Sequence, residues 1–486
     1  MRKPILLLLL VITQTVIAQT AQAQTWQDTV KTIESLFTRY KPDAPGCELA
    51  ISRNGQLIYS KAWGLADLEH HVTLTTTSPT EAGSVSKQFT AAAILLLQQQ
   101  GKLSLDDDVR KYIPELPDYG KTIRLRYLMH HTSGIRDWGS IAAIAGWPRT
   151  TKTYSNTDAL DIICRQQALN NTPNDTFIYS NSNYNLCAII VQRVSGMSLA
   201  DFTKKYIFQP AGMTHTSWRD DHKRIVPDRA IAYSKKGDNY ETNMPNEDVY
   251  GNGGLLTTAE DLLKWNTFYE NKNLGGPDFL KQQLATDPLN NGKPNNYGAG
   301  LFIGHQFGQS LISHDGATAS YRAYLGAFPE SNWSIAWLSN TSAFDRDANP
   351  PRQVINLFFI NNQTGNKFEP ITVSDTKTMM VLSPEELQPY TGYYYSTEAQ
   401  TGFTVELKDH QLYLSRPPST SFSIHPTGKD SFQTSGAPFD GAPGTITFVP
   451  DKSNDKGNDK SAPKKMLISI DRALNVSFTR ADKPQP

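Results

Sequence analysis

The sequence predicts an α+β fold with two parts. The first is an antiparallel sheet flanked by helices with a helical subdomain beside it, and the second is a small all-β domain, a barrel or a sandwich. Strand-like alternation stands at both ends of the first part, with mostly helical and loop sequence between them. From about residue 365 onward, the sequence changes to short segments in which apolar and polar residues alternate, as in β-strands. Such an order favours one sheet assembled from both ends of the first domain.

The first predicted strands form a hairpin. The stretch "CELAISRNGQLIYSKAWG" alternates apolar and polar residues on both sides of Asn54-Gly55. This dipeptide between two alternating runs is typical of a type I′ turn. A helix is predicted next over "SVSKQFTAAAILLLQQQ", because Val85, Phe89 and Ala92 fall on one stripe at helical spacing.

Later segments complete both parts. The stretch "HDGATASYRAYLGAFPESNWSIAWLSN" predicts more strands, and "RQVINLFFI" predicts a helix. In the second part, Phe403, Val405 and Leu407 alternate with polar neighbours. The segment "KDHQ" then makes a turn, and Leu412 and Leu414 alternate on the return strand. The charged stretch "DKSNDKGNDKSAPKK" is predicted to be a mobile loop.

The N-terminus has the pattern of an export signal. Arg2 and Lys3 precede an apolar run over residues 5–12, and the small residues Ala21 and Ala23 have the spacing of a cleavage site. The apolar run is too short to span a bilayer, which disfavours a membrane anchor. We expect a mature chain that begins near Gln24, lies in the periplasm or outside the cell, and has no stable membrane span.

Composition limits the class of partner. The chain has 486 residues, with 47 Lys+Arg and 47 Asp+Glu, and this zero net charge argues against a nucleic-acid partner. Cys47, Cys164 and Cys187 form an odd set in apolar contexts, which fits buried thiols, with one disulfide left open. No His/Cys spacing indicates a metal, so neither metal nor cofactor is predicted.

Two serines in "EAGSVSKQFT" compete for the role of nucleophile. Residues three apart share one face of a helix, so Ser84 lies beside Lys87 and Ser86 does not. A hydroxyl becomes an effective nucleophile when a neighbouring base takes its proton, and a lysine shielded from water loses its charge more easily. The sequence therefore predicts Ser84 as the nucleophile. The alternative is that Ser84 only caps the helix.

Two further motifs support this prediction. The tripeptide "YSN" begins at Tyr154 and again at Tyr179, and "SHDGATASYRA" contains His314 and Gly316. With S-x-x-K, this ordered set resembles the class C-like branch of the serine β-lactamase and penicillin-binding-protein superfamily. That branch also contains D-aminopeptidases, carboxypeptidases and esterases. The stretches "LMHHTSGI", "IFQPAGMTHTSW" and "GNGGLLTTAEDLLKW" add to the resemblance, which covers roughly residues 29–362.

The resemblance implies the domain organisation. The first part is expected to have the β-lactamase/transpeptidase-like sheet with its helical subdomain, and the second resembles the lipocalin-like appendage of some relatives. We expect a signal peptide at 1–23, a hydrolase domain at 24–364, a linker at 365–385 and a β-barrel at 386–486.

The resemblance also implies the catalytic roles. Ser84 attacks a carbonyl and is acylated, while Lys87 and Tyr179 share the work of the base. A phenol near a lysine ammonium has its ionised form favoured, so Tyr179 is expected to pass protons near neutral pH. The second "YSN" is the better candidate because a helix ending at Ser-Gly follows it. Tyr154 is interpreted as a surface or loop tyrosine, with Thr157 or Asp158 capping the helix behind it.

Substrate-binding roles follow in the same way. Asn181 is implied to bond Lys87 and the substrate amide. The oxyanion hole is implied to use the backbone N–H groups of Ser84 and Ala317. Gly316 belongs to the same motif as His314 and is also implied to line the substrate site. Water finally releases the acyl group.

The third motif departs from the pattern of standard β-lactamases and carboxypeptidases. His314 stands where they carry a lysine that helps to bind the substrate carboxylate. An imidazole is mostly neutral above a pKa of roughly 6.5, so attraction for a carboxylate weakens. We expect His314 to contact substrate and its ionisation to shape the pH profile. A purely structural histidine is the alternative.

The sequence therefore predicts an exported serine hydrolase that acts on a small peptide, amide or ester. Alternatives are a D-aminopeptidase or D-Ala-D-Ala carboxypeptidase, or a true class C-like β-lactamase. A penicillin-binding sensor that is acylated without turnover, and an interaction protein with a decayed site, are rivals from other classes. The predicted partner is a small-molecule or peptide substrate, and the oligomeric state is left open.

Overall fold

The computed structural model describes residues 26–149, 151–271, 273–345, 349–359, 380–417, 420–449 and 463–482. The predicted signal peptide, most of the predicted linker and most of the charged loop lie outside these ranges.

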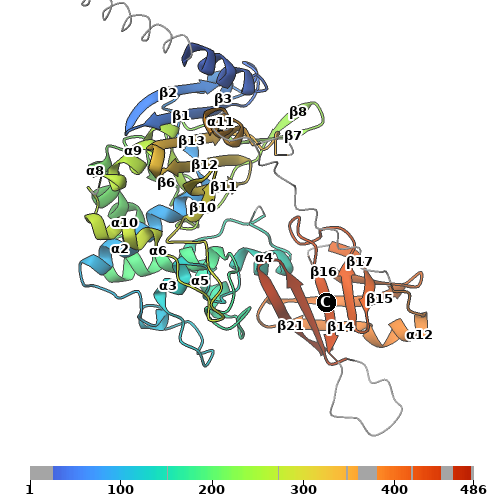
Figure 1. Ribbon diagram of the computed structural model, residues 1–486. Coiled ribbons are helices and arrows are strands. Elements are labelled where there is room, and N and C mark those ends of the chain that lie inside the picture. Colours follow the sequence, from blue (N-terminus) through green and yellow to red (C-terminus); the bar gives the residue numbers. More distant parts are fainter. Residues whose placement is uncertain are drawn as a thin grey trace, which may run out of the picture.

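One antiparallel sheet of six strands, in the order β10-β11-β12-β13-β1-β2, forms the frame of the first domain. Strand β1 pairs with β13, so the two ends of the domain lie side by side, as predicted (Figure 1). The turn between β1 and β2 has φ values of 52° at Asn54 and 72° at Gly55, which agrees with a type I′ hairpin. The strands are β1 (Cys47–Arg53), β2 (Gln56–Trp63), β10 (Phe302–Gln306), β11 (Gln309–Thr318), β12 (Tyr321–Phe328) and β13 (Trp333–Ser339).

The two faces of this sheet bury different cores. Leu49 and Ile51 of β1 belong to a core that also contains residues of α11 (Pro350–Phe359) and of the helical segment 26–36. Ala50, between them, faces the larger core shared with α9 (Ala259–Glu270) and the helical subdomain. This separation follows from the period-2 alternation of strand side chains.

Helix α2 (Lys87–Gln99) lies in the middle of the larger core and follows the 3₁₀ turn η1 (Gly83–Ser86). It is buried on nearly every face, whereas the sequence predicted a single apolar stripe. Small side chains at 91–93 suit this position, because helix α6 (Asn181–Ser195) contacts α2 directly.

Other helices and short strands complete the first domain. The helical elements are η2 (Val109–Lys111), α3 (Leu125–Met129), α4 (Trp138–Ala145), α5 (Asn156–Cys164), α7 (Leu199–Thr203), η3 (Lys204–Phe208), α8 (Gln209–Ala211), α10 (Pro277–Leu284) and η4 (Pro329–Ser331). The short strands are β3 (Leu65–Asp67), β4 (Val72–Thr73), β5 (Thr80–Glu81), β6 (Ser217–Trp218), β7 (Tyr233–Lys236), β8 (Asn239–Thr242) and β9 (Leu255–Thr257).

The second domain is a closed barrel of eight antiparallel strands in sequence order, as predicted. Phe403 and Val405 point into its core from one strand, and Leu412 and Leu414 from the next. Two short helical turns, α12 (Pro384–Leu387) and η6 (Gln388–Tyr390), precede the barrel. Its strands are β14 (Gly392–Ser396), β15 (Thr401–Lys408), β16 (Gln411–Arg416), β17 (Thr420–Gly428), β18 (Ser431–Thr434), β19 (Thr445–Val449), β20 (Lys465–Ile470) and β21 (Ala473–Ala481).

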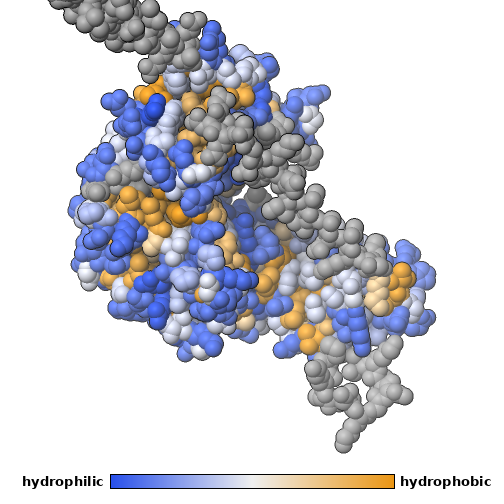
Figure 2. Space-filling model, viewed as in Figure 1, coloured by the Kyte–Doolittle hydropathy of each residue, from blue (hydrophilic) through white to orange (hydrophobic). Residues whose placement is uncertain are grey.

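The barrel lies against the helical side of the first domain, next to α4 (Figure 1). A buried ion pair fixes the contact: Arg136 Nη1 lies 2.7 Å from Glu398 Oε1, with side chains 1% and 4% exposed. On the face shown in Figure 2, the surface is hollowed between the sheet and the barrel.

All three cysteines are free thiols. Among the described residues no single helix has the length and apolarity to cross a membrane, although the pair 181–195 and 199–211, bent by 77°, meets that test jointly.

Candidate active site

Ser84 and Lys87 meet one helical turn apart. Ser84 lies in η1 rather than in the α-helix itself, and the side chains of residues i and i+3 eclipse in a 3₁₀ turn. The Nζ atom of Lys87 is consequently 3.0 Å from Oγ of Ser84. Ser86 is fully buried; it donates to Gly83 O at 2.6 Å and accepts from Leu255 N at 3.1 Å. Its hydroxyl is therefore engaged in structural hydrogen bonds.

Lys87 is enclosed by protein. Its Nζ atom also donates to Asn181 Oδ1 at 3.0 Å and to the backbone carbonyl of Asn252 at 2.6 Å. Burial lowers the pKa of this lysine well below its usual value, and the guanidinium groups of Arg472 and Arg149 lower it further. A neutral amine beside a hydroxyl is the arrangement that a general base requires.

Tyr179 completes the group from the residue before the N-cap of α6. Its ring centroid lies 4.8 Å from Lys87 Nζ. Burial raises the pKa of the phenol, while a hydrogen bond with Ser84 and the charge of Arg472 act in the lowering direction. The expected ionised phenol is therefore not favoured: with Lys87 tending to neutrality, Tyr179 stays protonated.

Asn181 is the first residue of α6, and backbone hydrogen bonds at residues 180 and 181 hold it in place. Its backbone N–H donates to Asp137 Oδ2 at 2.6 Å, while the N–H of Ser180 donates to His131 Nδ1 at 3.2 Å. These contacts fix the direction in which the "YSN" segment enters the helix, and they explain why its asparagine side chain faces Lys87.

His314 is buried, and both of its ring nitrogens have protein partners. Nε2 lies 2.9 Å from the phenol oxygen of Tyr297, and Nδ1 lies 2.6 Å from the carbonyl oxygen of Asp315. Burial and the nearby Lys87 lower its pKa to about 3. The expectation that His314 ionisation shapes the neutral pH profile is therefore wrong. Its ring does border the cleft, so a role in substrate contact stays a prediction.

Two glycines bring η1 against β11. A Cβ atom on Gly316 would lie 2.1 Å from the carbonyl oxygen of Ala82, and one on Gly83 would lie 2.7 Å from the nitrogen of Ala317. Gly83 also has a φ of 49°, which favours glycine. The close approach places Ser84 and Ala317 on the same wall of the cleft, where the oxyanion hole was predicted.

These residues surround a cleft of about 600 Å³. Every predicted site residue lines it except Lys87, which lies behind Ser84 and Asn181. The structure adds lining residues that the sequence did not single out: Arg149, Asn252, Phe302 and Arg472. Only the position of Asn252, in the loop that begins "GNGG", carried a sequence signal.

The first "YSN" copy lies outside this cleft, but its tyrosine was misjudged. Tyr154 is 4% exposed and donates to the carbonyl oxygen of Trp147 at 2.5 Å, so it is a buried residue. The N-cap of α5 is Ser155, which forms a capping box with Asp158.

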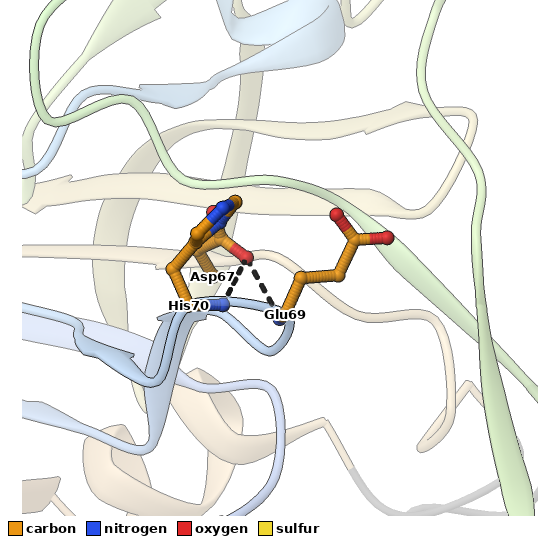
Figure 3. A group of neighbouring side chains, drawn as sticks. All are labelled: Asp67, Glu69 and His70. Atoms are coloured by element: carbon orange, nitrogen blue, oxygen red, sulfur yellow. Dashed lines mark hydrogen bonds and ion pairs between the residues drawn. The ribbon is translucent and has the colours of Figure 1, made fainter.

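Two clusters away from the cleft contain metal-ligand residue types. In the first, Asp67 accepts from the backbone N–H groups of Glu69 and His70, and its other oxygen lies 2.7 Å from His70 Nδ1 (Figure 3). These bonds serve a tight turn. The second cluster is Asp221, His222 and Asp248. Neither offers an observation that points to a bound ion.

Comparison with known proteins shows the family of the chain. Residues 23–357 match the family described as "Beta-lactamase". The chain belongs to the beta-lactamase family. It is 30% identical over 338 residues to penicillin-binding protein 4* of Bacillus subtilis, which covers 65% of this chain and 72% of that protein. It is 29% identical over 316 residues to protein Flp of Staphylococcus aureus, covering 62% of this chain and 61% of Flp.

Two solved structures share the fold of this chain over more than nine-tenths of its length. An octameric penicillin-binding protein homologue from Pyrococcus abyssi superposes with a TM-score of 0.60 at 21% identity, over 93% of this chain and 100% of that one. SurE superposes with a TM-score of 0.60 at 20% identity, over 95% and 100%. A D-amino acid amidase from Ochrobactrum anthropi matches 68% of this beta-lactamase-family chain, with a TM-score of 0.57 at 19% identity over 99% of its own length.

Proposed function

We propose that this beta-lactamase-family chain is an exported serine hydrolase that cleaves a small peptide, amide or ester through an acyl-enzyme on Ser84. The supporting observation is the 3.0 Å contact between Lys87 Nζ and Ser84 Oγ. Because burial lowers the pKa of Lys87, the amine is able to accept the hydroxyl proton.

The proposed reaction has two halves. As Oγ of Ser84 attacks the carbonyl carbon, Lys87 takes its proton, and the N–H groups of Ser84 and Ala317 stabilise the oxyanion. Tyr179, protonated in the resting enzyme, gives its proton to the leaving nitrogen or oxygen and regains one from the Lys87 ammonium. Water then attacks the acyl group, with the same groups moving the proton in reverse.

The substrate is proposed to be small, because the cleft measures about 600 Å³. Among proteins of the same fold are a D-amino acid amidase and SurE solved with D-Leu. We therefore place D-amino-acid amides first in a substrate panel, followed by short-chain esters and a chromogenic cephalosporin. An aminopeptidase, a carboxypeptidase and a β-lactamase would use the same chemistry and differ in which panel member they turn over.

The test compares Ser84→Ala with Ser86→Ala, using a fluorophosphonate probe and the substrate panel. Ser84→Ala is expected to lose labelling and hydrolysis. Ser86→Ala is expected to keep both, at a lower melting temperature, because it loses the bonds to Gly83 and Leu255. Hydrolysis that survives in Ser84→Ala would overturn the proposal. Labelling of the wild type without steady-state turnover of any substrate would instead support the sensor alternative.

Export is proposed from the basic, apolar and small-residue sequence pattern of the first 23 residues. N-terminal sequencing of protein recovered from the periplasm or medium is expected to begin near Gln24. An intact N-terminus in the cytoplasmic fraction would contradict export.

A further inference from the structure

The tip of one barrel hairpin reaches the active site. Strands β20 and β21 are joined by a two-residue turn, Asp471-Arg472. Arg472 lines the same cleft as Ser84, and its Cζ atom lies 5.0 Å from the ring centroid of Tyr179. The catalytic cleft thus contains a residue of the second domain.

Backbone contacts hold this tip in place. The carbonyl oxygen of Arg472 accepts from Asp137 N at 3.0 Å and from Asn170 Nδ2 at 3.1 Å. The N–H of Leu474 donates to Asn170 Oδ1 at 2.7 Å. Asp137 also accepts from the backbone of Asn181, so one residue positions both the tip and the catalytic asparagine. Because the anchors use the backbone, the Arg472 side chain is not needed for docking.

Behind the tip, the buried ion pair joins the two domains. Arg136 donates to Glu398, and it also donates to the carbonyl oxygens of Leu474 at 3.0 Å and Asn475 at 3.0 Å. Glu398 in turn accepts from the N–H of Ser477 at 3.2 Å. The start of β21 is therefore fixed to Arg136 of the hydrolase domain, and the barrel residue Glu398 links that arginine to the same strand.

The arginines of the cleft differ in how their charge is balanced. Arg149 makes two hydrogen bonds to the buried carboxylate of Glu247. Arg322 makes two to Asp345. Their guanidinium groups are committed to these carboxylates.

Arg472 is balanced more weakly. In the described part of the chain its ion pair is to Asp471, from Nε at 3.3 Å, with side chains 40% and 60% exposed. A solvent-exposed pair of this kind contributes little and exchanges readily for a better partner. A guanidinium can bind a carboxylate through two parallel hydrogen bonds.

We infer that Arg472 binds a carboxylate of the substrate next to the scissile bond, so that the barrel supplies the positive charge that the motif at His314 lacks. The inference rests on the proposed function and narrows its substrate to acids, such as short peptides with a free carboxyl terminus. It also gives the barrel a role in the reaction: its hairpin tip selects the substrate.

The test uses two acylating probes that differ in this group: a reporter penicillin, which carries a carboxylate, and an uncharged fluorophosphonate. The measured quantity is the ratio of their second-order labelling rates. Arg472→Ala is expected to lower the penicillin-to-fluorophosphonate rate ratio about tenfold or more. Arg472→Lys is expected to lower it less, because lysine keeps the positive charge but cannot form two parallel hydrogen bonds to a carboxylate. Asp471→Asn is expected to raise it, because the competing carboxylate is removed.

Taking a ratio cancels any change in Lys87 basicity that both probes share. An unchanged ratio in Arg472→Ala, in a variant with wild-type melting temperature, would overturn the inference. Loss of penicillin labelling in Asp471→Asn would also overturn it. If neither probe labels the wild type at Ser84, the proposed function itself fails, which is a distinct outcome.

Discussion

The phenol oxygen of Tyr297 lies 2.9 Å from Nε2 of His314, and this contact helps to fix which ring nitrogen of the imidazole carries the proton. The other ring nitrogen faces the carbonyl oxygen of Asp315, which can only accept, so Nδ1 carries the proton. Nε2 then accepts from the Tyr297 hydroxyl. A neutral imidazole with both nitrogens engaged explains how histidine replaces lysine here without leaving a buried charge.

This arrangement predicts a pH dependence of stability. The folded-state pKa of His314 is about 3, below the roughly 6.5 of an unfolded chain, so the unfolded state binds the proton first. The contribution of His314 to the free energy of unfolding is therefore fully present above pH 6.5 and is lost as the pH drops from there toward 3. His131, whose pKa burial also lowers, acts in the same direction.

Urea unfolding between pH 7 and 4 measures this effect. His314→Gln is expected to reduce the pH slope by up to about 1.4 kcal/mol per pH unit. His305→Gln, at an exposed position on β10, is the matched control and should leave the slope unchanged. Equal slopes for wild type and His314→Gln would contradict the buried neutral imidazole.

Replacement of Lys87 by methionine removes the proposed base but keeps an apolar stem of similar length. Lys87→Met is expected to lower the acylation rate of Ser84 about 10³-fold, and to abolish the acid limb of its pH profile. Stopped-flow acylation across pH measures both. Lys102→Met, at an exposed lysine beyond the other end of α2, should behave as wild type. A retained acid limb in Lys87→Met would assign that limb to another group.

The close contact between η1 and β11 predicts a cost for any side chain at Gly316. The added Cβ of Gly316→Ala would lie 2.1 Å from the Ala82 carbonyl, so the strand or the turn must shift. We expect the free energy of unfolding to fall by about 1–3 kcal/mol and acylation to slow about 10²-fold. In Gly304→Ala, on neighbouring β10, no atom lies within 4 Å of the new Cβ, so both quantities should stay near wild type. Similar losses in both variants would contradict the packing explanation.

The domain contact predicts a large effect of one buried arginine. Arg136→Met leaves the Glu398 carboxylate buried without its cation, which is expected to cost about 3–5 kcal/mol in urea unfolding. The double variant with Glu398→Gln should cost less. Arg193→Met, which breaks a half-exposed pair with Glu115, should cost at most about 1 kcal/mol. A small loss in Arg136→Met would mean that the barrel docks by other contacts.

Local sequence patterns were sufficient for much of the fold and site. The spacing of Ser84 and Lys87, the Asn54-Gly55 turn and the alternation of the barrel strands depend on neighbours in the chain. The contacts that the sequence missed join distant segments. Tyr297 meets His314, the Asn252 carbonyl meets Lys87, and Arg472 enters from another domain. The protonated state of Tyr179 was missed for a related reason, because burial outweighs the nearby charges only once the helices are packed.

The most direct test of the central claim locates the acyl group within one peptide. Trypsin digestion after labelling with the fluorophosphonate releases residues 62–87, which contain both candidate serines of the first motif. Fragment mass spectrometry is predicted to place the adduct on Ser84. An adduct on Ser86, or on any peptide from another part of the chain, would contradict the assignment of the nucleophile and the mechanism built on it.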